Sequence, residues 1–308
     1  MDLVNNLMLG FATALSFQNL FYCFAGVLIG TLIGVLPGIG PVATLAMLLP
    51  TTYALEPTSA LIMLAGIYYG AQYGGSTTAI LVNLPGESSS VVTCLDGYQM
   101  ARRGRAGAAL ATAALGSFFA GTIGVVVVAA LAAPMVELAF KFGPAEYFSL
   151  MVLGLIGAVV LASGSLIKAI AMIVLGLLLG IVGTDVNSGV ARFSFDIPDL
   201  ADGIGFVAVA MGVFGFAEII ANLEHKEGKR ETFTDKVGKL MPSKEEFKEA
   251  WPAVLRGTGL GSVLGVLPGG GALLSAFAAY TVEKKITRNP KIPFGQGNIR
   301  GVAAPESA

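Results

Sequence analysis

The chain has 308 residues, of which 55% are hydrophobic and 13% charged, and its formal net charge is -1. Because soluble domains carry about a quarter charged residues, this composition excludes an ordinary soluble enzyme or binding domain. The near-neutral charge also excludes the basic surface of a nucleic-acid-binding protein. Apolar runs of about 20 residues, long enough to cross a bilayer, predict an all-α polytopic membrane protein.

The first 16 residues are expected to form an amphipathic helix. They contain no basic region and no small-residue cleavage site, which argues against a removable signal peptide. Residues 17–224 predict a first membrane region of about six spans, residues 225–256 a charged cytoplasmic connector, and residues 257–308 the start of a second unit. The apolar runs behind these spans are 17–36, 58–74, 107–138, 144–162, 166–182, 203–223 and 257–267.

Basic residues set the expected orientation of the spans. Arg102, Arg103 and Arg105 precede the third span, Lys168 precedes the fifth, and a dense basic cluster follows the sixth. Because cytoplasmic loops are enriched in Lys and Arg, we expect these loops to face the cytoplasm. The orientation of the chain before Arg102 stays open.

One segment of the sequence occurs twice. Residues 30–41 recur at 261–272 with seven of twelve positions identical, which indicates an internal duplication. Such a pair of interrupted apolar segments is typical of transporters built from two related repeats. The residues expected to open the two helices are Pro37, Gly38 and Gly40 in the first copy and Pro268, Gly269, Gly270 and Gly271 in the second.

A Leu-Pro-Gly-x-Gly sequence should break a helix inside the membrane, because Pro removes a backbone donor and Gly tolerates unusual backbone angles. The freed N–H groups at the start of a half-helix suit a carboxylate, and freed carbonyls suit Na+. The nearby stripe of Gly26, Gly30 and Gly34 is better explained by close helix packing.

A second polar stretch covers residues 69–78 and is followed by a short apolar run and by residues 85–90. This pattern favours a re-entrant hairpin over a plain interfacial loop, which stays as the alternative. The candidate binding residues here are Gly75, Ser76, Thr77, Thr78, Asn83, Pro85 and Gly86.

Near its end, the chain again places a proline, an acid and a hydroxyl after a Gly-rich stretch, as Pro305, Glu306 and Ser307. After Tyr280 nothing matches the long apolar continuation that follows Pro50. The second unit is therefore expected to be incomplete.

Long motifs occur in a fixed order at residues 30–41, 69–78, 84–87, 96–98, 104–107, 202–206, 267–271, 283–285 and 301–308. In these motifs the chain resembles TctA, the large membrane subunit of the tripartite tricarboxylate transporter family. The resemblance implies a multi-pass protein of the bacterial cytoplasmic membrane, surrounded by lipid. It also implies a small TctB-like membrane subunit, a periplasmic TctC-like solute-binding protein, and cation-driven uptake of citrate-like tricarboxylates or dicarboxylates.

Other functions fit the sequence less well. A serine protease needs a base beside its nucleophile, and the one histidine, His225, lies in the charged connector. Cys23 and Cys94 lack metal-ligand spacing, and no Walker lysine is present, so we expect no enzyme, metal or cofactor. A membrane scaffold that does not transport is the remaining alternative.

The expected coupling ion is Na+, with H+ as the alternative. Because no buried acid is expected to serve as a proton carrier, Na+ is assigned to Ser76, Thr77, Asn83 and the Pro-Gly loops. If transport follows the proton gradient instead, Glu87 or Glu306 becomes the proton carrier.

Overall fold

The structure is a computed structural model that describes residues 2–141, 143–161, 165–185, 188–205, 208–209, 212–213, 220, 239–265 and 271–308. Among these residues the chain is mostly helical, and the strands β1 (Gly183–Thr184) and β2 (Ala191–Arg192) form a single two-residue ladder. The predicted all-α class is confirmed.

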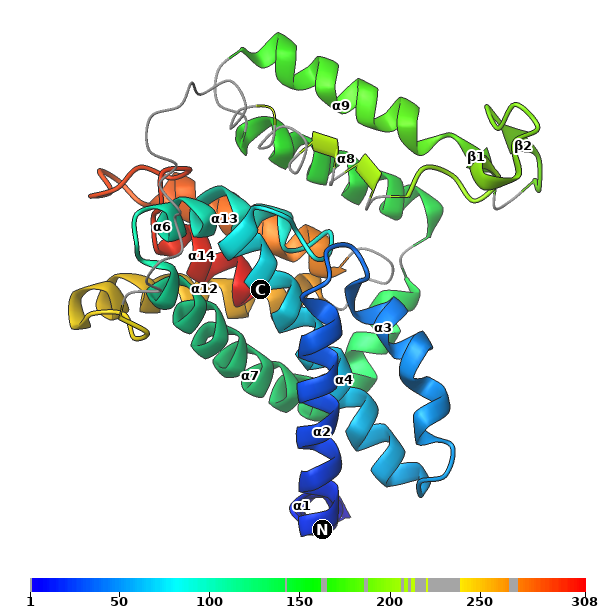
Figure 1. Cartoon of the computed structure of the whole chain (residues 1–308), viewed down its shortest axis with the longest axis vertical. Helices are drawn as coiled ribbons and strands as arrows, with labels where there is room; N and C mark the ends of the chain where they lie inside the picture. Colours follow the sequence, from blue (N-terminus) through cyan, green and yellow to red (C-terminus); the bar gives the residue numbers. More distant parts are fainter. Residues whose placement is uncertain are drawn as a thin grey trace.

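The N-terminal helices form one packed group. Helix α1 (Asp2–Ala14) leads into α2 (Phe17–Gly34), whose N-terminus is capped by the hydroxyl of Ser16. Helix α3 (Gly40–Leu48) continues into the 3-10 turn η1 (Leu49–Thr52), and both α2 and α3 pack on α4 (Pro57–Val82), as Figure 1 shows.

Glycines let α2 and α4 approach until their backbones touch. A Cβ atom on Gly30 would overlap the Ile67 carbonyl of α4, and a Cβ atom on Gly70 would overlap the Val27 carbonyl of α2. The same holds at Gly34, next to the backbone of α4. The packing role predicted for the glycine stripe of α2 is therefore confirmed.

After α4 the chain passes through short elements into the longest helix. These elements are α5 (Val91–Thr93), the wide turn η2 (Cys94–Tyr98) and α6 (Gln99–Arg102), followed by α7 (Ala106–Phe140). Helices α8 (Pro144–Leu161) and α9 (Leu166–Gly180) lie at the edge of the molecule (Figure 1). The turn η3 (Pro198–Leu200) follows them in the sequence.

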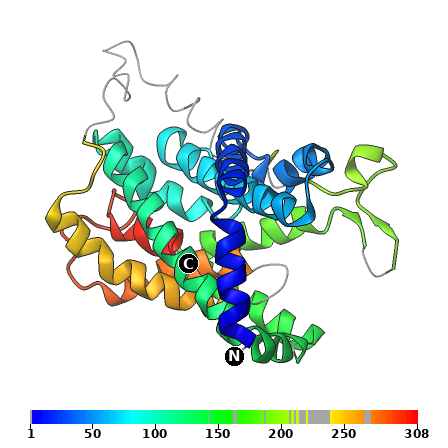
Figure 2. The same ribbon diagram turned by 90° about the horizontal axis from the view of Figure 1, so that it is seen from below.

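The C-terminal helices α12 (Lys244–Leu264), α13 (Gly271–Ile286) and α14 (Arg300–Glu306) gather beside α7 (Figure 2). Small residues make this possible, since Ala109, Ala113, Ala253 and Ala303 are all fully buried between these helices. Helix α12 begins inside the predicted connector, at a capping box formed by Ser243 and Glu246. That box explains why a helix starts in so polar a segment.

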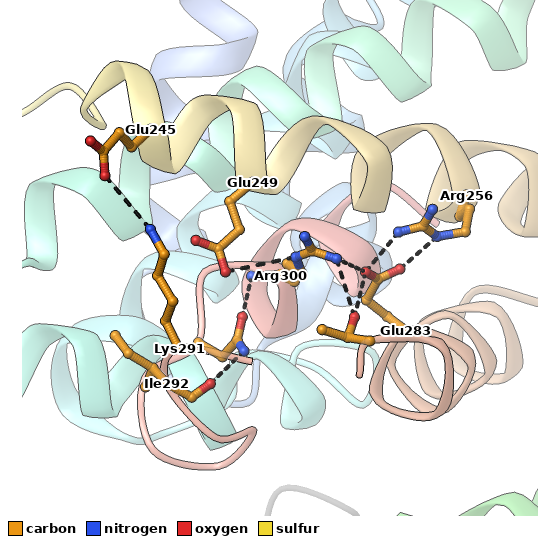
Figure 3. A network of polar contacts seen from close by, with 9 residues as sticks. Glu245, Glu249, Arg256, Glu283, Lys291, Ile292 and Arg300 are labelled. Carbon is orange, nitrogen blue, oxygen red and sulfur yellow. Dashed lines mark hydrogen bonds and ion pairs between the residues drawn. The ribbon is translucent and has the colours of Figure 1, made fainter. Parts of the chain in front are cut away.

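Ion pairs fix the C-terminal helices to one another (Figure 3). The buried Glu283 of α13 accepts hydrogen bonds from Arg256 of α12 at 2.7 and 2.8 Å and from Arg300 of α14 at 3.2 Å. Arg300 also lies 3.8 Å from Glu249 of α12. One buried carboxylate thus holds three helices together.

A second buried acid holds the loop that leads into α14. The Oδ1 atom of Asp96 accepts the backbone N–H groups of Gly295, Gly297 and Asn298 at 2.7 to 2.9 Å. Its Oδ2 atom accepts the hydroxyl of Tyr280 at 2.7 Å. These contacts and the Glu283 ion pairs set the position of α14.

Helix α4 is continuous from Pro57 to Val82, so residues 72–78 lie within an unbroken helix. The re-entrant hairpin predicted for this stretch is therefore not confirmed. Most of the predicted span 203–223 lies outside the described residues.

Two helical stretches in the described part of the chain are long and apolar enough to cross a membrane, Phe17–Gly34 and Ala106–Leu131. Two shorter apolar helices run over Pro144–Ile156 and Leu166–Gly180. Helix α9 buries none of its residues and exposes large side chains such as Ile167 and Met172. An apolar surface of this kind belongs in lipid or against another subunit.

Candidate functional site

The first Leu-Pro-Gly-x-Gly sequence breaks its helix as predicted. Helix α2 ends at Gly34 and α3 begins at Gly40, with Pro41 in its first turn. Between them Gly38 has a φ of 86°, and Gly40 has a φ of 64°, a left-handed backbone that favours glycine. A Cβ atom on Gly40 would lie 3.9 Å from Glu87, so this break is beside the loop that follows α4.

For the second Leu-Pro-Gly-x-Gly sequence, the structure describes the helix before it and the helix after it. Helix α12 ends at Leu264 and α13 begins at the buried Gly271, whereas Pro268, Gly269 and Gly270 lie outside the described residues. The two copies are thus flanked alike by separate helices.

The loop 83–90 turns back along α4 after Asn83, which ends that helix in a left-handed conformation with a φ of 59°. A Cβ atom on Gly86 would overlap Gly75, so the loop backbone touches the helix at this point. The hydroxyl of Ser89 donates to Oε1 of Glu87 at 2.7 Å, and the hydroxyl of Ser90 donates to the Glu87 carbonyl at 2.9 Å.

A cavity of about 550 Å³ lies between this loop and the C-terminal helices. Gly265 and Ala272, on either side of the second Leu-Pro-Gly-x-Gly sequence, also line it. Its polar lining from α4, the loop and α7 is Tyr69, Gln72, Ser76, Glu87, Ser89, Ser90 and Ser117. Its polar lining from α12 and α14 is Thr258, Ser262, Glu306 and Ser307.

Three elements place hydroxyl groups on Glu306. The hydroxyl of Thr93 donates to Oε1 of Glu306 at 2.5 Å, and the hydroxyl of Ser76, which donates to the Gln72 carbonyl at 3.4 Å, lies beside the Glu306 side chain. Ser117 of α7 donates to the Glu306 carbonyl at 2.8 Å. Glu306 is half-buried as a residue, and it lines the cavity.

The two cavity acids influence each other. Glu87 lies in a loop, outside the membrane-spanning helices, and burial raises its pKa to about 7. The hydrogen bond from Ser89 opposes this rise in the pKa, and the negative charge of Glu306 adds to it. The loop and α14 therefore bring two carboxyl groups into one electrostatic site.

The cavity gathers part of the predicted set of binding residues, namely Ser76, Pro305, Glu306 and Ser307. The hydroxyls of Thr77 and Thr78 instead donate to the carbonyls of Tyr73 and Gly75 in their own helix. The described candidates that do not line the cavity are Pro37, Gly38, Gly40, Gly75, Thr77, Thr78, Asn83, Pro85, Gly86 and Gly271.

No buried acid was expected to serve as a proton carrier, and the structure places two half-buried acids, Glu87 and Glu306, on the wall of the cavity. A signal for them is present in the sequence, since Pro85-Gly86-Glu87-Ser88 and Pro305-Glu306-Ser307 are similar. Gln72, Ser89, Ser117 and Thr93 carry no comparable signal, because only the fold brings them to this site.

Comparison with known proteins matches residues 20–308 to the tripartite tricarboxylate transporter TctA family. An uncharacterized 52.8 kDa protein in the TAR-I ttuC' 3' region of Agrobacterium vitis is 60% identical over 308 residues, 100% of this chain and 61% of that protein. An uncharacterized protein in the TAR-II ttuC' 3' region of the same organism is 62% identical over 48 residues, 16% of this chain and 19% of that protein. The chain thus spans 61% of the length of the first relative. No solved structure matches.

Proposed function

This chain belongs to the tripartite tricarboxylate transporter TctA family, and on that premise we propose that it is the membrane-spanning subunit of a cation-coupled carboxylate uptake system. The observation that carries the proposal is the position of the cavity. Glu87 on its wall lies next to the first helix break, and Gly265 and Ala272 on its wall flank the second Leu-Pro-Gly-x-Gly sequence. Substrate sites of secondary transporters form in this way, between interrupted helices of two repeats.

The transported solute is a citrate-like tricarboxylate or a dicarboxylate. The N–H groups at the starts of α3 and α13 suit its carboxylates, because a helix N-terminus attracts anions. Alternating access then follows from movement of the two repeats about the Leu-Pro-Gly-x-Gly segments. A periplasmic TctC-like protein delivers the solute.

The assembly includes a small TctB-like subunit in the bacterial cytoplasmic membrane. The exposed apolar side chains of α9 are consistent with this location, because apolar surface of this kind is covered by lipid, by a second subunit or by another part of a longer chain.

The alternative function is that of a membrane scaffold without transport. A scaffold needs apolar helices but has no use for polar side chains around a cavity. Uptake of radiolabelled citrate into vesicles that hold the full-length protein and its partner subunits separates the two functions.

Gly38→Leu should abolish this uptake, because leucine disfavours the left-handed backbone of the first break. The control is Gly176→Leu on α9, where an added Cβ atom meets no other atom. Both variants are first checked for membrane insertion and partner binding. If Gly38→Leu inserts and still transports at the control rate, the scaffold function is favoured.

A further inference from the structure

The charges around the cavity are unbalanced. Glu87 and Glu306 both line it, and none of its described lining residues is a lysine, arginine or histidine. The arginines of α12 and α14 do not balance these negative charges, because Arg256 and Arg300 form ion pairs with Glu283. Two neighbouring carboxylates without a counter-charge oppose each other's ionisation and repel an anionic solute.

Two oxygen atoms of residues that line the cavity also have no hydrogen-bond partner among the described residues. Ser307 is 1% exposed, and among the described residues its Oγ atom has no hydrogen-bond partner. The Oε1 atom of Gln72 is buried and equally without a partner. A buried polar atom without a partner costs about 1–3 kcal/mol, so a bound species is expected to satisfy these atoms.

A metal cation fits this set of groups better than a proton. A single proton satisfies one carboxyl oxygen and leaves the oxygens of Gln72 and Ser307 without a partner. Hard cations take several oxygen ligands from carboxylates, amides and hydroxyls. Ser76 donates its hydrogen to the Gln72 carbonyl and Thr93 donates its hydrogen to Glu306, and both hydroxyl oxygens still offer lone pairs to a cation.

We propose that the cavity binds Na+ between the carboxylates of Glu87 and Glu306, and that Na+ must be bound before a carboxylate solute can enter. The cation lowers the repulsion that the two acids exert on the anion, because it leaves one net negative charge in place of two. It also joins the loop after α4 to α14, the two segments that carry the Pro-Gly-Glu-Ser and Pro-Glu-Ser sequences. The Na+ site rests on the cavity alone, whereas the order of binding rests on the proposed function.

The test is binding of radiolabelled Na+ to the purified full-length protein without partner subunits. The pH is about 8, so that the carboxyl groups are mostly ionised. We expect saturable binding that Glu306→Gln and Glu87→Gln each weaken about tenfold or more. Glu56→Gln is the matched control, because Glu56 is an exposed acid at the start of α4. Absence of saturable Na+ binding, or unchanged binding in both cavity variants, overturns the site.

Ser307→Ala keeps both acids and serves as a second variant should the glutamine variants fail to fold. We expect it to weaken Na+ binding by several-fold, since it removes one ligand oxygen, and unchanged affinity counts against that oxygen as a ligand.

The order of binding is tested with radiolabelled citrate in sodium or choline buffer. We expect citrate binding in sodium and at least about tenfold weaker binding in choline. Equal citrate binding in both buffers overturns the order of binding but leaves the transport function in place. Na+ binding without any citrate binding or uptake overturns the transport function but leaves the Na+ site in place.

Discussion

Glu87 and Glu306 have similar neighbours in sequence but different surroundings in the structure. Glu87 is held by hydroxyls of its own loop, Ser89 and Ser90. Glu306 is held by Thr93 and Ser76, which come from more than 200 residues earlier in the chain. A substitution at Glu87 therefore acts mainly on one loop, whereas a substitution at Glu306 also affects the contact of α14 with α4 and α5.

The pH dependence of Na+ affinity should report on Glu87. Its pKa of about 7 means that the carboxyl group gains a proton as the pH falls through 7 and loses its charge. We expect Na+ affinity to be full well above pH 7 and to fall below it, because proton and cation compete. The charged and titratable groups that face Glu87 are Glu306 from α14 and Tyr68 from α4.

The measurement is Na+ affinity at about pH 6 and about pH 8, on either side of this pKa. In Glu87→Gln the dependence between these two values should become shallower, while Glu56→Gln should keep the wild-type profile. An unchanged profile in Glu87→Gln assigns the titration to another group.

At the scale of helices, the Glu283 ion pairs make a testable contribution to stability. Arg256→Ala removes two of the hydrogen bonds to this buried carboxylate, and Arg300 alone is left to neutralise it. We expect a loss of about 3 kcal/mol in the free energy of unfolding, because a buried charge loses a partner. The measurement is the thermal unfolding of the detergent-solubilised protein.

The matched control for Arg256→Ala is Lys291→Ala. Lys291 pairs with Glu245 at 3.7 Å, and the two side chains are 76% and 87% exposed. Such exposed pairs contribute less than about 1 kcal/mol. Equal destabilisation by both substitutions would contradict a special role for the buried pair.

The contact of α2 and α4 gives a prediction about packing. Gly70→Ala places a methyl group against the Val27 carbonyl and pushes the two helices apart. We expect a loss of about 1–3 kcal/mol, the range for overpacked cores. Gly176→Ala, on the exposed face of α9, should leave stability unchanged or raise it slightly. Thermal unfolding of both variants distinguishes these outcomes.

The apolar runs predict several helices well. The predicted span 144–162 corresponds to α8 at Pro144–Leu161, and 166–182 corresponds to α9 at Leu166–Gly180. Prediction fails for α4, which extends eight residues beyond the expected end at Gly74. The polar residues in that extension donate to carbonyls of their own helix, as Ser76 and Thr77 do, and Ser76 also lines the cavity. Composition alone does not distinguish these environments from a loop.

The candidate site was predictable only in part, for a similar reason. The helix break at Pro37 follows from local backbone chemistry, which the sequence contains. The pairing of Glu87 with Glu306 depends on contacts between α14 and segments about 200 residues away. Without a fold, neither acid could be assigned to an interior cavity.

At the scale of the whole molecule, the cavity lies between two groups of helices with different packing. In the first group, α2 and α4 meet through glycine backbones, and in the second, α12, α13 and α14 meet through alanines and one network of ion pairs. Helix α7 contacts both groups and supplies Ser117 to the cavity wall. The cavity acids come from both groups, so its shape depends on how the groups are placed.

The direct backbone contact at the glycines of α2 and α4 restricts how this protein can move. Two backbones in direct contact have no rotamers to exchange and no gap to close, so sliding or tilting of one helix against the other would produce immediate steric collision. We therefore expect helices α2 and α4 to move together as one rigid body. Relative motion is left to boundaries filled by flexible side chains, and one of these is the cavity wall to which Glu87 and Glu306 both belong.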